Sequence, residues 1–120
     1  MAPVAEPALI PDIALQYLGE LSTDIRTSVL LGADGEIAAA APAAADAASL
    51  RRLTLRFFEQ ADDADDQEVA QIEVSTGDAA VYATRERNWT VAVVTGRFSL
   101  PSLMFYDLRT VLAALEQTPG

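Results

Sequence analysis

The feature that most constrains this chain is an Asp34-Gly35 pair set between two apolar runs, within the segment SVLLGADGEIAAAA of residues 28–41. An Asp-Gly pair in this context is the strongest short-range signal of a β-hairpin, because a type I′ turn requires a positive φ at both central residues. We therefore expect strands at residues 27–32 and 36–41, joined by a tight turn. Helix-like segments lie on both sides, so the chain is predicted to begin as helix, hairpin, helix.

Helical periodicity marks those two segments. In the first helix, Asp12 follows Pro11 and is the expected N-cap. Its apolar stripe consists of Ala14, Leu18, Leu21 and Ile25. The second helix is expected at residues 42–61, and its stripe must be covered by protein. That stripe consists of Leu50, Leu53, Thr54, Phe57, Phe58 and Ala61.

Three strands and a last helix follow. Apolar and polar residues alternate through residues 67–75, which predicts a half-covered strand at an edge of the sheet. Residues 79–84 are expected to form the next strand. The run WTVAVVT from Trp89 is apolar on both faces, as expected of a central strand. The final helix opens near Pro101, and its stripe consists of Leu100, Met104, Leu108, Val111, Leu112 and Leu115.

The predicted fold class is therefore α+β, with a five-stranded antiparallel sheet flanked by three helices in the order αββαβββα. A chain of 120 residues with 51% apolar content is long enough for one core and too short for two ordinary domains. We expect a flexible, proline-containing arm at residues 1–11, the domain at residues 12–117 and a tail at residues 118–120.

Composition excludes several classes of function. The chain has no Cys and no His, so disulfides, thiolate nucleophiles, imidazole bases and the usual zinc sites are absent. Its net charge is −10, and its eight cations are all Arg. Nucleic acids and anionic membranes are bound through basic patches, so neither is an expected partner, and a basic surface on another protein suits this charge better. No apolar stretch approaches the roughly 20 residues of a membrane helix, and the arm lacks the basic region of a signal peptide, so we expect a cytoplasmic protein.

Four carboxylates follow the second predicted helix, at Asp62, Asp63, Asp65 and Asp66. They lack the alternating ligands, the central Gly and the closing Glu of a calcium-binding loop. Negative charge at the C-terminal end of a helix is also unfavourable. We therefore expect a mobile, solvated loop and no metal site.

No group of residues points to catalysis. Asp34, Glu73 and Asp107 are conceivable acids and bases, but their spacing fixes no two of them in one cleft, and no Gly-rich phosphate loop follows a strand. An arginine supplied to a partner's nucleotide is also conceivable, although an Arg in a turn between strands is usually just solvated. The residues in question are Arg85, Arg87 and Arg97. We expect no enzyme activity, no catalytic residue and no cofactor.

The expected edge strand suggests how two copies of the chain would associate. An edge presents unpaired N–H and C=O groups that are a template for another chain. Pairing through residues 67–75 would lay the second helices of two copies side by side, over the apolar surface around Leu55 and Phe58. A symmetric homodimer satisfies both needs. The residues expected at this interface are Val69, Gln71, Ile72, Glu73, Leu55 and Phe58.

At this point the residues resemble a known family. The order αββαβββα, the VLLGADGEIAAA hairpin, the AVYATRERNWTVAVVT strand pair and the terminal SLPSLMFYDLRTVLAALE helix are together similar to the roadblock/dynein light chain family, over about residues 12–117. The resemblance implies a profilin-like architecture. The all-Ala second strand and the Asp-rich loop depart from the family pattern.

The resemblance also implies a function. It implies a bacterial dimer, of identical or related chains, that regulates or scaffolds an NTPase without being an enzyme, above all a Ras-like small GTPase. Regulation would come from contact between surfaces rather than from an inserted arginine. The implied surface lies on the second helix and consists of Arg52, Arg56 and Glu59, with Leu55 as apolar anchor.

Two other functions stay open from the sequence. A small-molecule sensor would need a pocket within the core, which the Ala-rich second strand is suited to line. A purely structural adaptor would need only surfaces for larger partners.

Overall fold

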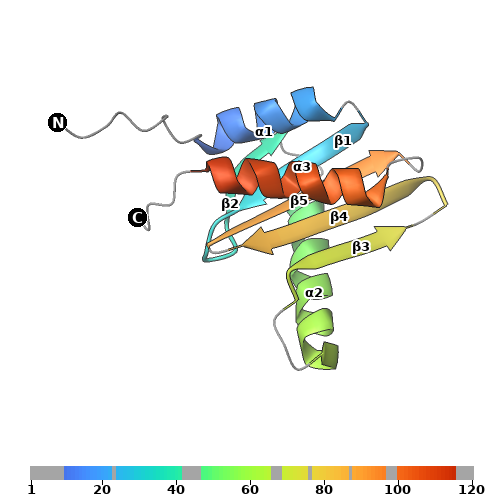
Figure 1. Cartoon of the computed structure of the whole chain (residues 1–120). Coiled ribbons are helices and arrows are strands. Elements are labelled where there is room, and N and C mark those ends of the chain that lie inside the picture. The colour runs from blue at the N-terminus through green and yellow to red at the C-terminus, as the bar shows by residue number, and fades with distance from the viewer. Residues whose placement is uncertain are drawn as a thin grey trace.

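The computed structural model describes residues 10–22, 24–41, 47–65, 69–75, 77–86, 88–96 and 100–115. Three helices and five strands alternate along these residues in the predicted order αββαβββα (Figure 1). The elements are α1 (Pro11–Leu21), β1 (Ile25–Leu31), β2 (Ile37–Ala41), α2 (Ala47–Asp65), β3 (Gln71–Ser75), β4 (Ala79–Glu86), β5 (Trp89–Gly96) and α3 (Pro101–Ala114). The predicted fold class is confirmed.

The strands form one sheet in the order β2-β1-β5-β4-β3, and every neighbouring pair is antiparallel. The central strand is β5, as its two apolar faces predict, and its residues Val91, Ala92 and Val93 are fully buried. The edge predicted for the half-polar strand is also confirmed, since β3 lies at the end of the sheet opposite β2. This strand order leaves β3 with one unpaired side.

The sheet separates two layers of unequal thickness (Figure 1). Helices α1 and α3 lie side by side over one face, where the larger core cluster includes Leu18, Leu30, Tyr82 and Leu108. Helix α2 lies alone over the other face and crosses the strands steeply. One helix is too narrow to cover a five-stranded sheet, so this second face is the less protected of the two.

The Asp34-Gly35 hairpin forms, but its turn is not the expected two-residue type I′ turn. The N–H of Gly35 donates to the carbonyl of Gly32 at 2.9 Å, and the N–H of Gly32 donates to the carbonyl of Glu36 at 3.0 Å. This places three residues in the loop, with Gly35 in the left-handed region at φ 78°. Asp34 closes the turn by accepting the N–H of Glu36 rather than by adopting the central position of a type I′ turn.

Helix α1 begins two residues earlier than expected. Its N-cap is Ile10, Pro11 occupies the first helical position, and no side chain caps the end. Proline is favoured there because its missing N–H would have no partner in any case. Asp12 therefore lies in the first turn, where its charge complements the helix dipole, and the prediction that it caps the helix is wrong.

Several apolar residues that the periodicity assigned to the core lie at the surface. Leu21 and Leu100 are 40% and 66% exposed, and Leu53 is 42% exposed. Ile25 belongs to β1 and not to the first helix. The stripes were placed correctly at their centres and were too wide at their margins. The Ala-rich strand β2 is explained by α1, which packs directly on it with Ala39 in the core cluster.

No helix among the residues described is long and apolar enough to cross a membrane.

We predict that Gly35→Ala destabilises the fold by about 1 kcal/mol, because an L side chain at the left-handed φ of this residue is strained. Gly19→Ala is the matched control. Gly19 lies in α1 with open space around it, so alanine there should stabilise the helix by roughly 0.5 kcal/mol. Urea unfolding of both variants checks this prediction, and equal effects of the two substitutions would contradict it.

Candidate protein-interaction surface

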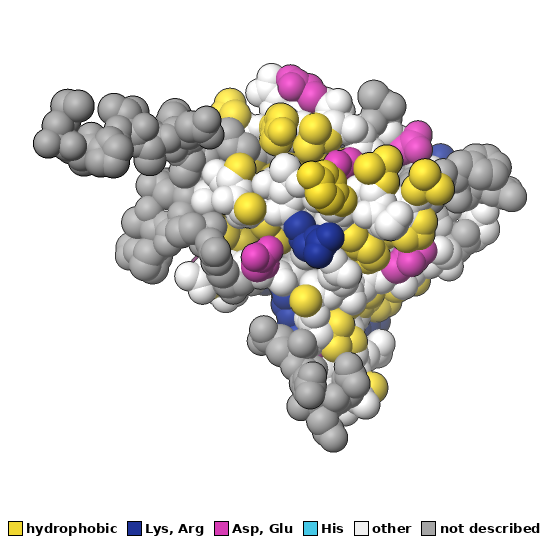
Figure 2. Space-filling view, viewed as in Figure 1, with side chains coloured by type: hydrophobic (Ala, Val, Ile, Leu, Met, Phe, Trp, Pro, Cys, Tyr) yellow, Lys and Arg dark blue, Asp and Glu magenta, His cyan; other side chains and the backbone are white. Residues whose placement is uncertain are grey.

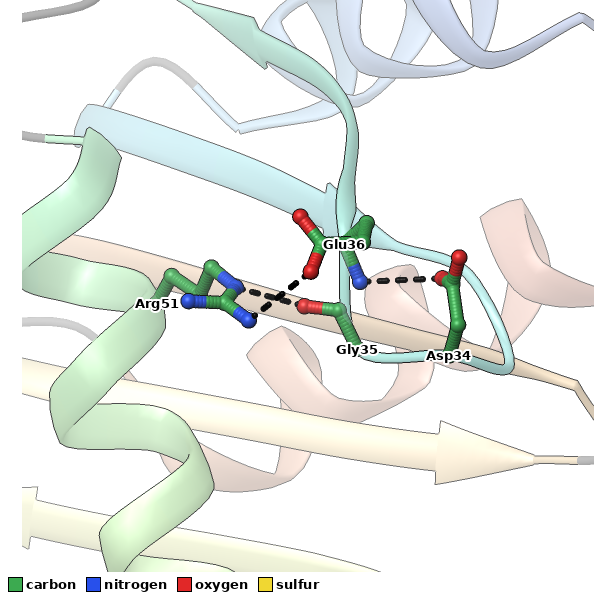
Figure 3. Close-up of polar contacts among 4 residues, drawn as sticks. All are labelled: Asp34, Gly35, Glu36 and Arg51. Atoms are coloured by element: carbon green, nitrogen blue, oxygen red, sulfur yellow. Dashed lines mark hydrogen bonds and ion pairs between the residues drawn. The ribbon is translucent and has the colours of Figure 1, made fainter.

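Helix α2 is fastened to the sheet near its N-terminal end by Arg51. The Arg51 Nε donates to the carbonyl oxygen of Gly35 at 2.6 Å, and its guanidinium also contacts the Glu36 carboxylate at 3.4 Å (Figure 3). The carbonyl of Gly35 is available because the three-residue loop turns it toward the helix. The hairpin predicted from Asp34-Gly35 therefore also positions α2.

A second contact fastens the C-terminal end of α2. The Asp62 carboxylate forms an ion pair with Arg85 of β4 and accepts the N–H of Val69 at 2.9 Å. The Arg85 guanidinium also lies over the ring of Phe58, 4.3 Å from its centroid. A cation over an aromatic face adds about 0.5–2 kcal/mol to such a contact. The ion pair, the hydrogen bond and the cation–π contact thus all stabilise the packing of α2 on β4 at this point.

This contact corrects the expectation of a solvated Asp loop. Helix α2 continues to Asp65, so Asp62 and Asp63 are helical. The side-chain hydrogen bond from Arg85, followed by the backbone N–H of Val69, holds the pKa of Asp62 below its ordinary value. The nearby cation also offsets the repulsion between Asp62 and the negative end of the helix. Asp66 lies outside the described residues.

The two fastening contacts fix which side of α2 faces which part of the sheet. Arg51 and Asp62 project from the same flank of the helix, at 100° per residue, and both face the ends of the strands where the β1–β2 turn lies. Leu55 lies on this flank as well, since its methyl groups are 3.8 Å from the position of a Cβ on Gly35. Leu53 and Phe57 therefore project from the opposite flank.

Strand pairing defines two rows of side chains on the face that α2 covers. The first, here called the covered row, is continuous across four strands and is buried apart from its last, half-buried member. It consists of Val29, Ala92, Ala83 and Ile72. Leu50 and Phe58 of α2 belong to the same core cluster as this row. Helix α2 thus lies along the covered row.

The neighbouring row, here called the open row, is less protected. It consists of Thr27, Val94, Val81 and Val74, and its three valines are all partly exposed. The flank of α2 toward this row carries the exposed Leu53 and the partly exposed Phe57. Apolar side chains of a helix and a sheet therefore border one surface that the single chain leaves incompletely covered.

The edge of β3 has three residues whose backbone faces outward. The N–H of Arg85 donates to the carbonyl of Ala70, and partners alternate along an antiparallel ladder, so Ala70, Ile72 and Val74 pair with β4. The N–H and C=O groups of Gln71, Glu73 and Ser75 consequently point away from the sheet. At Val69 the outward N–H is already bound by Asp62, which ends the open edge on that side.

The residues expected at the dimer interface do not all lie at the open edge of the sheet. Gln71, Ile72 and Glu73 lie on the open edge strand, as predicted. Phe58 is 3% exposed beneath Arg85, so in the single chain it offers little surface to a partner. Leu55 lies on the flank away from the open row. Leu53 and Phe57 lie on the flank toward the open row.

The expected partner-binding residues lie together on the outward side of α2. Arg52, Arg56 and Glu59 are exposed, and none of them forms an ion pair with another described residue. Leu55 lies between them and the hairpin turn. It lines an open groove of about 230 Å³, together with residues that include Gly32, Arg85 and Trp89. The groove is not lined by β2, so it does not support the pocket that a sensor function would need.

The conceivable catalytic residues are not brought together. Asp34 lies in the hairpin turn and Glu73 on the exposed edge strand, whereas Asp107 is buried on α3. None of them lines the groove. Arg85 is committed to Asp62 and Phe58, while Arg87 and Arg97 lie outside the described residues. Within the described ranges, no three acidic side chains gather into a group suited to hold a metal ion.

Sequence reasoning missed Arg51 as a determinant of the surface and placed Leu53 in the buried stripe. A helical projection separates Arg51, Leu55 and Asp62 from Leu53 and Phe57, and that separation was a usable signal. It did not reveal which flank meets the hairpin, because that depends on the contact between Arg51 and the carbonyl of Gly35.

This architecture was compared with those of known proteins. No family model matches the sequence, and no curated protein matches it. Solved structures do match. A roadblock/LC7 domain from Streptomyces avermitilis is 18% identical with a TM-score of 0.75, over 89% of this chain and 93% of that one. The chain has the roadblock/LC7 fold.

Two further structures with this fold are of proteins named MglB, the first of them described as a gliding protein. The protein from Thermus thermophilus is 13% identical with a TM-score of 0.71, over 96% of this chain and 95% of that one. The protein from Myxococcus xanthus is 12% identical with a TM-score of 0.71, over all of both chains. The roadblock/LC7 fold thus spans nearly the whole chain, as the sequence resemblance predicts.

We predict that Asp62→Asn lowers the midpoint of thermal unfolding at pH 7, because the charge that Arg85 stabilises is lost while the acceptor oxygen is kept. The folded state lowers the pKa of Asp62, so its contribution to stability is present above the ordinary value of 3.8 and is lost as the pH falls through the lower folded value. The difference between the variant and the native chain should therefore disappear in acid. Asp63→Asn, at the exposed neighbouring position, is the control, and equal pH profiles for both variants would contradict the role of Asp62.

Proposed function

We propose that this chain is a non-enzymatic, cytoplasmic regulator or scaffold of a Ras-like small GTPase, and that it acts as a homodimer joined through β3 and α2. The observation that carries the proposal is the open edge of β3 beside the partly exposed open row and the apolar flank of α2. The unpaired backbone groups of β3 lack hydrogen-bond partners among the described residues, and the apolar surface beside them lacks cover. Both lie at the same edge of the molecule. The likeness of the fold to gliding proteins supports a regulatory role.

Side-chain charge favours one register for the paired edges. A two-fold axis at Glu73 would oppose two carboxylates across the strands, which is destabilising. An axis at Ile72 instead brings Gln71 of one copy opposite Glu73 of the second copy and places the two Ile72 side chains together. Those isoleucines lie on the face of the sheet that α2 covers. The covered rows of the two copies would then meet end to end at Ile72, and the two α2 helices, which lie along these rows, would approach each other above that contact.

The GTPase would contact the outward side of α2. Arg52, Arg56 and Glu59 supply charged groups without ion-pair partners among the described residues, and Leu55 supplies an apolar centre beside the groove. A small central apolar contact within a charged rim is the usual arrangement of a binding hot spot. In a two-fold dimer these surfaces lie on both copies, so one GTPase could touch either or both.

We predict a dimer at micromolar concentration in light scattering after size exclusion. Glu73→Pro removes an N–H that points to the open edge and spares the ladder to β4, and Leu53→Asp places a charge in the apolar flank. Each should shift the protein to a monomer with its circular dichroism retained. Gln16→Asp, on the exposed surface of α1, adds the same charge elsewhere and should stay dimeric. A native chain that is monomeric would contradict the dimer.

The register has its own test, because the chain has no Cys. Under mild oxidation, Ile72→Cys should form a covalent dimer, since directly opposed residues of a non-hydrogen-bonded pair are close enough for a disulfide. Val81→Cys, in the interior of the sheet on the same face, should not. Rapid cross-linking of Glu73→Cys instead of Ile72→Cys would show that the axis lies at Glu73.

We predict that the dimer binds the Ras-like GTPase encoded nearest to it and accelerates its GTP hydrolysis by about tenfold or more, which corresponds to about 1.4 kcal/mol in the barrier. The double variant Arg52→Glu, Arg56→Glu should lose binding. Arg109→Glu makes the same type of change on α3, across the sheet, and should bind normally. Binding without acceleration would favour a scaffold, and absence of both would remove this GTPase as the partner.

A further inference from the structure

The face opposite α2 carries an unusual amount of exposed apolar surface. Figure 2 shows hydrophobic side chains gathered over α1 and α3 on this side of the molecule. Six large residues, here called the α1/α3 face, are between 37% and 66% exposed. They are Ile13, Tyr17, Leu21, Leu100, Leu103 and Tyr106. Scattered apolar residues are normal on a protein surface, but a set concentrated on two packed helices marks an interaction site.

The spacing of these residues forms rows rather than a random scatter. Ile13, Tyr17 and Leu21 follow one another at intervals of four residues, so they lie along one side of α1. On α3, Leu103 and Asp107 have the same interval and share one side of that helix. Because α1 and α3 pack against each other, the two helices present one continuous surface.

Asp107 adds a chemical preference to this surface. The residue is 8% exposed, its carboxylate oxygens are not among the fully buried atoms that lack a partner, and no hydrogen bond or ion pair joins it to another described residue. Burial raises the pKa of the Asp107 carboxyl. Partial removal from water without a hydrogen-bond donor disfavours the charged carboxylate, and a cation brought next to it would stabilise that charge. Arg109 does not supply this cation, because it lies two residues after Asp107 and therefore projects from another side of α3.

The charges on α1 point the same way. Asp12 and Glu20 are its charged residues, both are acidic and both are exposed. The chain as a whole carries a net charge of −10. Of the charged residues on α1 and α3, three are acidic and one, Arg109, is basic, and Figure 2 shows a basic side chain beside the apolar ones. Carboxylates outnumber this cation, which suits a segment that combines apolar and basic residues.

We propose that the α1/α3 face docks an amphipathic helix of another protein, with apolar residues toward Tyr17 and Leu103 and a Lys or Arg that pairs with Asp107. A helix is the fitting form because two packed helices offer ridges and no free strand edge. This site is separate from the GTPase surface proposed above, which lies on the other side of the sheet. The protein would thereby bring a second partner together with the GTPase.

The charge pattern disfavours the other two occupants. A second copy would bring three acidic residues, Asp107, Glu20 and Asp12, and one basic residue, Arg109, against the same set, so repulsion between carboxylates outweighs attraction. The chain's own residues 1–9, MAPVAEPAL, contain no Lys or Arg to pair with Asp107.

The experiment uses the full chain and three fluorescent peptides of about five helical turns, followed by anisotropy. The first peptide carries Leu along one side and Lys beside it, the second replaces Lys by Glu, and the third is a scramble with the composition of the first. Only the first should bind at micromolar concentration. Leu103→Ser should weaken its binding about tenfold. Asp107→Asn should weaken it by a smaller factor and flatten its dependence on salt.

Ala48→Ser is the matched control, since it introduces the same side chain at an exposed position of α2, on the opposite face, and should leave peptide binding unchanged. Equal binding of the first and scrambled peptides, or no loss with Leu103→Ser, would overturn the proposal. Tighter binding after removal of residues 1–9 would assign the face to the chain's own segment. Assemblies larger than a dimer that Leu103→Ser abolishes would assign it to a second copy. Each result is independent of GTPase binding, which the Arg52→Glu, Arg56→Glu variant reports.

Discussion

Helix α2 is held in place by the contact of Arg85 with Asp62 and Phe58, and the exposed surfaces of this protein depend on it. The ion pair joins the end of α2 to β4, the ring of Phe58 lies beneath the cation, and the same carboxylate binds the N–H of Val69. With Arg51 bound to the hairpin at the other end, α2 has a single position across the sheet. Rotation of the helix by one residue would break both contacts at once.

That position leaves one border of the molecule incomplete. Helix α2 buries the covered row, and the open row, the flank of Leu53 and Phe57 and the outward groups of β3 are left beside it. Burial of apolar area and pairing of backbone groups are separate sources of free energy, and here both would be gained by the same association. In the proposed homodimer, a second copy would supply both. The α1/α3 face lies across the sheet, so its occupation would not compete with that association.

The sequence predicted the elements and their order well because each depends on local patterns. The apolar run at Trp89 identified the central strand, and the alternation that ends at Ser75 identified the edge. The errors came where a distant residue supplied what the local pattern lacked. Asp62 was expected in a frayed loop, because nothing nearby in the sequence offsets its charge, and Arg85 does so from 23 positions away. The turn at Gly35 was expected to be type I′ and is not, because a dipeptide does not reveal which carbonyl its neighbours bind.

The sequence by itself determined the αββαβββα order, the central and edge strands and the absence of Cys and His, since periodicity, turn residues and composition are local properties. Only the tertiary structure decided which flank of α2 meets the hairpin and which stays open. Both flanks carry leucine, at Leu55 and at Leu53, so the pattern treats them alike. A hydrogen bond to the carbonyl of Gly35 and an ion pair to Arg85 break that equivalence, and both join residues that meet only when the chain is folded.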